Sequence, residues 1–104
     1  MTQQATKLVI ITEKLLLRHI AQIIDAAGAT GYTVTAADGK GSRNIRSSGQ
    51  PAVAESFSNV KIEVIVADEA VARKIADEVA GKYFDNFSGI TYLDRIEVLF
   101  AHSL

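Results

Sequence analysis

The sequence predicts an α+β domain in which two helices cover one four-stranded antiparallel sheet. Four short runs have the apolar or alternating pattern of strands, and two longer runs between them have helical periodicity. The two halves of the chain repeat the order strand, helix, strand at similar lengths. The chain has 104 residues, enough to bury a core of its own, so we expect residues 1–104 to form a single domain.

The first half reads as strand, helix and strand. Leu8–Ile11 is a continuous apolar run, typical of a short strand buried on both faces. Thr12 is a candidate N-cap for a helix predicted at about 14–28, where apolar residues recur at helical spacing and Gly28 is a stop signal. Tyr32–Ala36 is rich in β-branched and aromatic residues, which predicts the second strand.

The second half repeats this order. Apolar and charged residues alternate from Val60 to Val66, as in a strand with one buried face. Asp68 is a candidate N-cap, and a clean apolar stripe predicts a helix at about 69–84. A strand-like run follows from Ile90 to Phe100.

This order is typical of the ferredoxin-like split β-α-β arrangement. Two helices can cover only one face of the sheet, yet Leu8–Ile11 is apolar at positions that face both ways. We therefore expect the uncovered face to meet other subunits in a closed oligomer with the sheets facing inward.

Composition excludes several classes of function. A net charge of −1 provides no long-range attraction to nucleic acid, so no nucleic-acid partner is expected. The absence of cysteine excludes disulfides, thiolate metal sites and thiol catalysis, and it is typical of a reducing cytosol. The first six residues lack the apolar stretch of a signal peptide and no apolar run exceeds four residues, so we expect a cytoplasmic protein.

The segment Asp38–Pro51 differs from the rest of the chain. It contains three of the seven glycines, the only proline, and three cations against one carboxylate. Glycine, lysine, arginine and serine are the residue types that bind phosphate, through backbone N–H groups and charged side chains. It lacks the GxxxxGK[ST] pattern of a P-loop. A solvated loop without a ligand explains the composition equally well, and a loop that contacts nucleic acid explains it less well.

Other polar residues give weaker signals. His19 and His102 do not match any metal-ligand spacing, and no Ser-His-Asp set can be assembled. Asp94 and Arg95 are either part of a cross-strand ion pair or, for Arg95, a phosphate ligand at a subunit boundary. We therefore predict neither a catalytic site nor a metal site.

Taken together, the element order, Asp38–Arg43 at the entrance to the long loop, and Ser88-Gly89 before the last strand resemble the PII-like signalling proteins. The resemblance is greatest to the SbtB type, which regulates the cyanobacterial bicarbonate transporter SbtA. It implies a homotrimer that binds cAMP, AMP, ADP and ATP in clefts between subunits. It also implies that residues 38–58 form a mobile T-loop that docks on the membrane transporter.

The resemblance assigns the nucleotide site residue by residue. The phosphate-binding group consists of Lys40, Gly41, Ser42, Arg43 and Arg46. The base and the rest of the cleft are assigned to Thr33, Gly89, Leu93 and Arg95. Whether a divalent cation accompanies ATP is left open.

The sequence departs from the family pattern in two respects. Residues 38–58 contain no tyrosine, so the uridylylation of PII proteins is not expected there. Members of the type often carry a C-terminal CGPxGC cysteine pair, and this sequence has no cysteine, so a redox switch is not expected. The prediction is a signalling protein rather than an enzyme. A weak nucleotide phosphohydrolase and a ligand-independent interaction scaffold are the alternatives.

Overall fold

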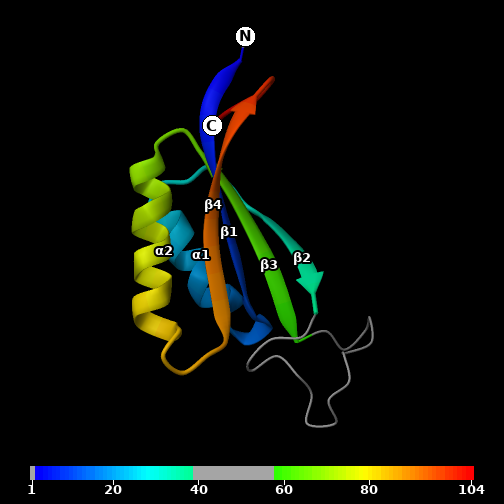
Figure 1. The fold of residues 1–104 in the computed structure, drawn as a ribbon, viewed down its shortest axis with the longest axis vertical. Helices are drawn as coiled ribbons and strands as arrows, with labels where there is room; N and C mark the ends of the chain where they lie inside the picture. The colour runs from blue at the N-terminus through cyan, green and yellow to red at the C-terminus, as the bar shows by residue number, and fades with distance from the viewer. Residues whose placement is uncertain (1, 39–57) are drawn as a thin grey trace.

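The structure is a computed structural model that describes residues 2–38 and 58–104. Its elements follow the order strand, helix, strand, strand, helix, strand (Figure 1). They are β1 (Gln3–Glu13), the 3₁₀ turn η1 (Lys14–Leu16), α1 (Leu17–Ala26), β2 (Thr33–Ala37), β3 (Asn59–Val66), α2 (Glu69–Tyr83) and β4 (Gly89–Val98). The predicted T-loop, except for its end residues 38 and 58, lies outside the described residues.

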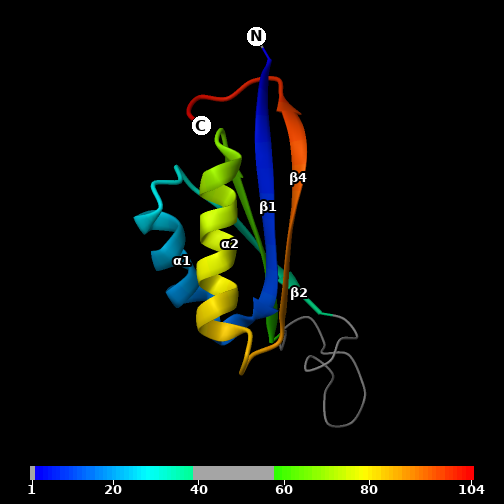
Figure 2. The same ribbon diagram turned by 60° about the vertical axis from the view of Figure 1, so that its left-hand side comes forward.

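The four strands form one antiparallel sheet in the order β2-β3-β1-β4. The central strand β1 pairs with β3 on one side and with β4 on the other. Figure 2 shows both helices on the same side of this sheet. The predicted fold class, an α+β ferredoxin-like domain with a four-stranded antiparallel sheet, is confirmed.

The core lies between the sheet and the helices. Every second residue of β1 and β3 points toward α1 and α2, because side chains alternate between the two faces of a strand. The fully buried members are mostly aliphatic and include Leu8, Ile10, Leu16, Ile20, Ile24, Ile62, Val64, Ile75 and Val79. Burial of these side chains supplies most of the driving force for docking the helices on the sheet.

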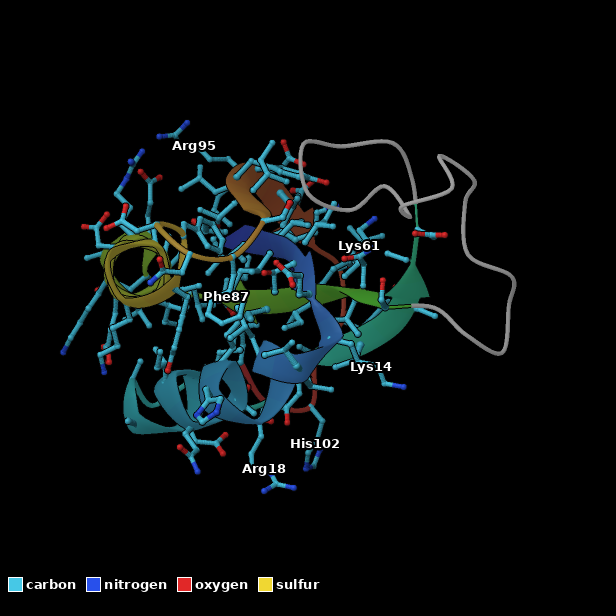
Figure 3. All side chains as sticks on the ribbon, turned by 90° about the horizontal axis from the view of Figure 1, so that it is seen from below. Lys14, Arg18, Lys61, Phe87, Arg95 and His102 are labelled. Atoms are coloured by element: carbon cyan, nitrogen blue, oxygen red, sulfur yellow. The ribbon has the colours of Figure 1, made fainter. Side chains whose placement is uncertain are left out.

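The opposite face of the sheet, called here the open face, has no helix over it. The register places Val9 beside Tyr92 and Glu63 on this face. Ile90 and Tyr92 remain 57% and 42% exposed. The open face also carries charge: Lys7 pairs with Asp94 at 3.9 Å and Lys61 with Glu63 at 3.3 Å. Figure 3 shows Lys61 on the side of the sheet away from α1.

Two boundaries at the start of the chain differ from the predictions. β1 covers Gln3–Glu13, well beyond the apolar run, because pairing with two neighbouring strands holds its polar residues in the sheet. Thr12 is not an N-cap but a strand residue, completely buried, whose hydroxyl donates to the carbonyl oxygen of Ser88 at 2.7 Å. The helix prediction at 14–28 corresponds to η1 followed by α1.

The prediction for the second helix is confirmed with its cap. The Asp68 carboxylate accepts a hydrogen bond from the Ala70 backbone N–H at 2.9 Å, and α2 ends at Tyr83. In β4 the strand ends at Val98, two residues before the predicted end, and Phe100 is 91% exposed. No helix in the described residues is long and apolar enough to span a membrane.

Candidate nucleotide site

A hollow of about 300 Å³ lies around Thr33, at the beginning of β2. Thr33 pairs with Glu63 of β3, so both side chains lie on the open face. The hollow is closed by residues that precede β2 and by the C-terminal segment after β4. Its lining consists of Thr30, Gly31, Tyr32, Thr33, Glu63, Ile65, Val98, Phe100, Ala101, Ser103 and Leu104.

The lining of this Thr33 hollow combines hydroxyl groups with apolar surface. Thr33 offers a hydroxyl that can donate or accept, and Glu63 offers carboxylate oxygens that only accept. Ile65 and Phe100 supply apolar surface. Among residues 2–38 and 58–104, the lining has no lysine or arginine. It therefore suits a flat polar group without negative charge better than it suits a phosphate.

A second part of the candidate site is the turn before β4, here called the Gly89 corner (Ser88 and Gly89). The last residues of β1 hold it from two directions. Glu13 accepts a hydrogen bond from the Ser88 N–H at 2.6 Å, and the buried Thr12 hydroxyl donates to the Ser88 carbonyl oxygen. A charged acceptor makes the first bond stronger than a neutral one, so the corner is held firmly against the end of β1.

Gly89 itself is required by packing. A Cβ atom at this position would overlap the ring of Phe84, which packs partly buried against the core. Glycine is the residue that lets β4 pass so close to this ring. The structure thus explains the glycine without a ligand, and its predicted role in nucleotide binding stays a prediction.

The two ends of the 38–58 connection are held by different elements, Ser58 by η1, which follows β1 directly, and Asp38 by the first residue of β3. The Lys14 N–H donates to the Ser58 carbonyl oxygen at 2.7 Å. The Asn59 side-chain amide donates to the Asp38 carboxylate at 3.2 Å. The predicted phosphate residues lie along this connection but outside the described residues; they are Lys40, Gly41, Ser42, Arg43 and Arg46.

Leu93 and Arg95 point to the helix side of β4 rather than to the open face. Leu93 pairs with the core residue Leu8 and lines a hollow of about 180 Å³ beside α2. Arg95 donates two hydrogen bonds to Glu69, from Nε at 2.8 Å and from Nη2 at 3.0 Å. Within the described residues, these two side chains are not brought together with Thr33.

Glu69 sits between two guanidinium groups. Arg73 donates to it at 2.9 Å from the next turn of α2, and Arg95 reaches it from β4. The hydrogen bonds from Arg73 and then Arg95 hold the pKa of the Glu69 carboxyl below its ordinary value. The sequence left two alternatives, a cross-strand ion pair or a phosphate contact by Arg95. The structure shows a cross-strand ion pair between Asp94 and Lys7, while Arg95 pairs with Glu69 of α2.

The predicted site residues are therefore divided between the two edges of the sheet. Thr33 lies on the edge strand β2, whereas Gly89, Leu93 and Arg95 lie on the other edge strand, β4. Three strand spacings separate these edges, about 14 Å. The Thr33 hollow reaches β4 only at its last residue, Val98, and does not include Gly89, Leu93 or Arg95.

Of the residues that line the Thr33 hollow, only Thr33 was predicted from the sequence as a site residue, and Glu63 and Ile65 are among those that were missed. Glu63 and Ile65 read only as members of an alternating strand, and the register that brings them beside Thr33 is set by pairing between distant segments. The available signal was the alternation itself, which places Glu63 and Ile65 on the face away from the core.

The family model described as nitrogen regulatory protein P-II matches residues 5–102 of this chain. The chain belongs to the P-II family. A PII-like signalling protein from Thermus thermophilus is 28% identical and similar in structure with a TM-score of 0.73, covering 93% of this chain and 90% of that chain.

Two further solved structures are similar. CPII from Thiomonas intermedia, described as a nitrogen regulatory PII-like protein bound to ADP, AMP and bicarbonate, is 25% identical with a TM-score of 0.73 over 94% of this chain and 98% of that chain. The GlnK-ATP complex of B. subtilis is 22% identical, with a TM-score of 0.60 over 92% of this chain and 84% of that chain. At that identity GlnK supports the fold alone.

Proposed function

We propose that this PII-like protein is a homotrimeric signalling protein that binds adenine nucleotides in the clefts between its subunits. The observation that carries the proposal is the position of Thr33 and the Gly89 corner on opposite edge strands of one sheet. A cleft formed between neighbouring chains unites the two edges, and the partly exposed apolar residues of the open face favour such an assembly. The nucleotides bound to CPII support the choice of ligand.

The two walls of the cleft have different tasks in this proposal. Thr33 and Glu63 hold the adenine base, because their hydroxyl and carboxylate groups match its amino group and ring nitrogens. The phosphates of cAMP, AMP, ADP or ATP are bound from the neighbouring chain by Lys40, Gly41, Ser42, Arg43 and Arg46. Gly89, Leu93 and Arg95 border that wall.

The output of the proposed switch is the 38–58 connection, acting as a T-loop. Ser58 at one end is hydrogen-bonded to Lys14, the residue that follows β1, and Asp38 at the other end is hydrogen-bonded to Asn59 of β3. The neighbouring residue Glu13, the last of β1, holds the Gly89 corner. A nucleotide that binds one arrangement of the loop more tightly shifts the population toward it. We propose an SbtB-type output, in which the cytoplasmic trimer associates with a membrane bicarbonate transporter of the SbtA kind. Coupling of about 1–3 kcal/mol would change the affinity for the transporter about 5- to 150-fold.

The binding proposal is tested by calorimetric titration of the purified protein with AMP, cAMP, ADP and ATP. We expect Arg46→Ala to weaken binding of every nucleotide, because it removes a charged phosphate donor. Thr33→Val keeps the β-branched shape and removes only the hydroxyl, so it should weaken binding about 2- to 10-fold. Thr35→Val, on the same face of β2 but outside the hollow, is the matched control.

Two results would contradict the binding proposal. If none of the nucleotides binds, the protein acts as a scaffold without a nucleotide ligand. If Thr33→Val and Thr35→Val bind AMP equally well, the Thr33 hollow is not the base site. A pull-down of the transporter at saturating AMP and at saturating ATP tests the output, and equal capture in both conditions would overturn the switching model.

A further inference from the structure

A second hollow, of about 540 Å³, lies on the outer side of the η1–α1 segment. It is larger than the Thr33 hollow and shares only Tyr32 with it. Its lining consists of Lys14, Leu15, Leu17, Arg18, His19, Ala21 and Tyr32. The helices lie on the other side of the sheet from the open face (Figure 2), and Tyr32 is the one residue of this α1 hollow that also borders the proposed nucleotide cleft.

The charge of the α1 hollow has no counter-charge among the described residues. Within that part of the chain, its lining includes two permanent cations and no carboxylate. In the part of the chain that the structure describes, Lys7, Lys61, Arg73, Lys82 and Arg95 each have a carboxylate partner. Lys14 and Arg18 have none there, and both extend outward from the η1–α1 segment (Figure 3). Two neighbouring cations without a partner in a concave surface attract an anion.

The rest of the lining is apolar and partly exposed. Leu15 is 64% exposed and Tyr32 is 39% exposed, although both are large side chains that gain free energy when covered. Leu17 and Ala21 complete the apolar part. His19 is held in place by its ring contact with Tyr83, at 6.0 Å between centroids. An apolar surface beside a few charged groups is the usual composition of a small-molecule site.

We propose that the α1 hollow binds a small amphipathic oxyanion. Lys14 and Arg18 bind its phosphate or carboxylate head group, and Leu15, Leu17 and Tyr32 cover its apolar body. The described lining of the Thr33 hollow has a carboxylate and no cation, so it favours an uncharged base. The α1 hollow has two cations and therefore favours an anion. The apolar side chains beside the two cations favour a small molecule with an apolar body over a bare inorganic anion.

The test is a titration of the isotopically labelled full chain in its native assembly, followed by backbone amide chemical shifts. Hexyl phosphate and hexanoate are the probes, and inorganic phosphate represents the head group alone. We expect saturable shifts in residues 14–21 and at Tyr32 with at least one of the two alkyl probes. Binding of inorganic phosphate should be weaker, because it leaves the apolar part of the hollow exposed.

The double variant Lys14→Gln/Arg18→Gln should weaken alkyl-anion binding about tenfold or more, because it removes both charged donors. Lys74→Gln is the matched control, since Lys74 is a cation without a carboxylate partner in the described residues but lies on α2, and it should leave binding unchanged. Circular dichroism checks that each variant is folded.

Three results would overturn the proposal. The first is that neither alkyl probe gives saturable shifts around α1. The second is that the double variant binds as tightly as the Lys74→Gln control. The third is that the protein sediments with phosphatidylglycerol vesicles but binds neither soluble probe, which would assign the cations to a membrane surface.

Discussion

Gly89 shows how one missing side chain positions an edge of the candidate site. A Cβ atom there would overlap the Phe84 ring, which packs partly buried against the core. We expect Gly89→Ala to lower the free energy of unfolding by about 1–3 kcal/mol, because the ring must move. Urea denaturation of the purified protein measures this change.

Gly81 provides the control for this substitution. It lies within α2, and a Cβ atom there would meet nothing within 4 Å. Gly81→Ala should raise stability by about 0.5–1 kcal/mol, because alanine is the better helix former. The two alanine substitutions should therefore act in opposite directions, and a Gly89→Ala variant as stable as the wild type would show that Phe84 does not limit this position.

Thr12 is a residue whose role depends on a distant partner. Its hydroxyl is buried and donates to Ser88, which is 76 residues away in the chain. Thr12→Val should cost about 1–3 kcal/mol, because the Ser88 carbonyl oxygen loses its buried donor while the side-chain shape is kept. Thr35→Val on the exposed edge strand should change stability by less than about 0.5 kcal/mol. Equal stability of the two variants in thermal unfolding would contradict this role.

At the scale of elements, α2 could be predicted closely because its signals are local. The apolar stripe, the Asp68 cap and Glu69 in the first turn all act within a few residues of the helix. The limits of β1 could not be predicted in the same way. Gln3, Gln4 and Lys7 do not follow the apolar pattern of a strand. They belong to β1 because each of them pairs with a residue of β4.

Glu69 joins α2 to β4 through Arg95 and therefore makes their contact sensitive to pH. Its pKa in the folded protein is below the ordinary value of 4.5, because Arg73 and Arg95 donate hydrogen bonds to the charged form. A carboxyl group with a lowered pKa stabilises the fold above its ordinary pKa, and this stabilisation is lost as the pH falls through the lower, folded value. Wild type should therefore exceed Glu69→Gln in stability at neutral pH.

Denaturation curves of both proteins between neutral and acidic pH measure this difference. The advantage of the wild type should begin to shrink near pH 4.5 and disappear once Glu69 is protonated in the folded protein. Glu97→Gln, on β4 without an ion pair in the described residues, should show no such dependence. A stability difference for Glu69→Gln that is the same at every pH would mean that the ion pairs do not cause it.

At the scale of the whole molecule, the fold could be predicted from the sequence, but the candidate site could be predicted only in part. The period of the apolar pattern determines which face of each strand is buried, and so the element order and the uncovered face could be predicted. The composition of the Thr33 hollow could not, because Glu63 and the C-terminal segment reach Thr33 only through strand register. The phosphate residues of 40–46 stay a prediction.

A charge placed on the open face tests directly whether the subunits of the proposed trimer meet through this face. Tyr92 lies on this face in the edge strand β4, beside Val9 of the central strand β1, and is 42% exposed in the single chain. Tyr92→Glu would place a carboxylate between packed sheets, where an unpaired charge is strongly disfavoured. We expect this variant to keep its fold but to lose the trimer, as measured by light scattering coupled to size-exclusion chromatography and by circular dichroism.

Leu15→Glu is the matched control for the open face. Leu15 is even more exposed, at 64%, but it lies on the helix side of the sheet, so the same new charge there should leave the trimer intact. If Tyr92→Glu still forms the trimer, the subunits do not meet through the open face, and the cleft that joins Thr33 to the Gly89 corner of a neighbour would have to be abandoned. If both variants dissociate, added negative charge rather than the position of Tyr92 controls assembly.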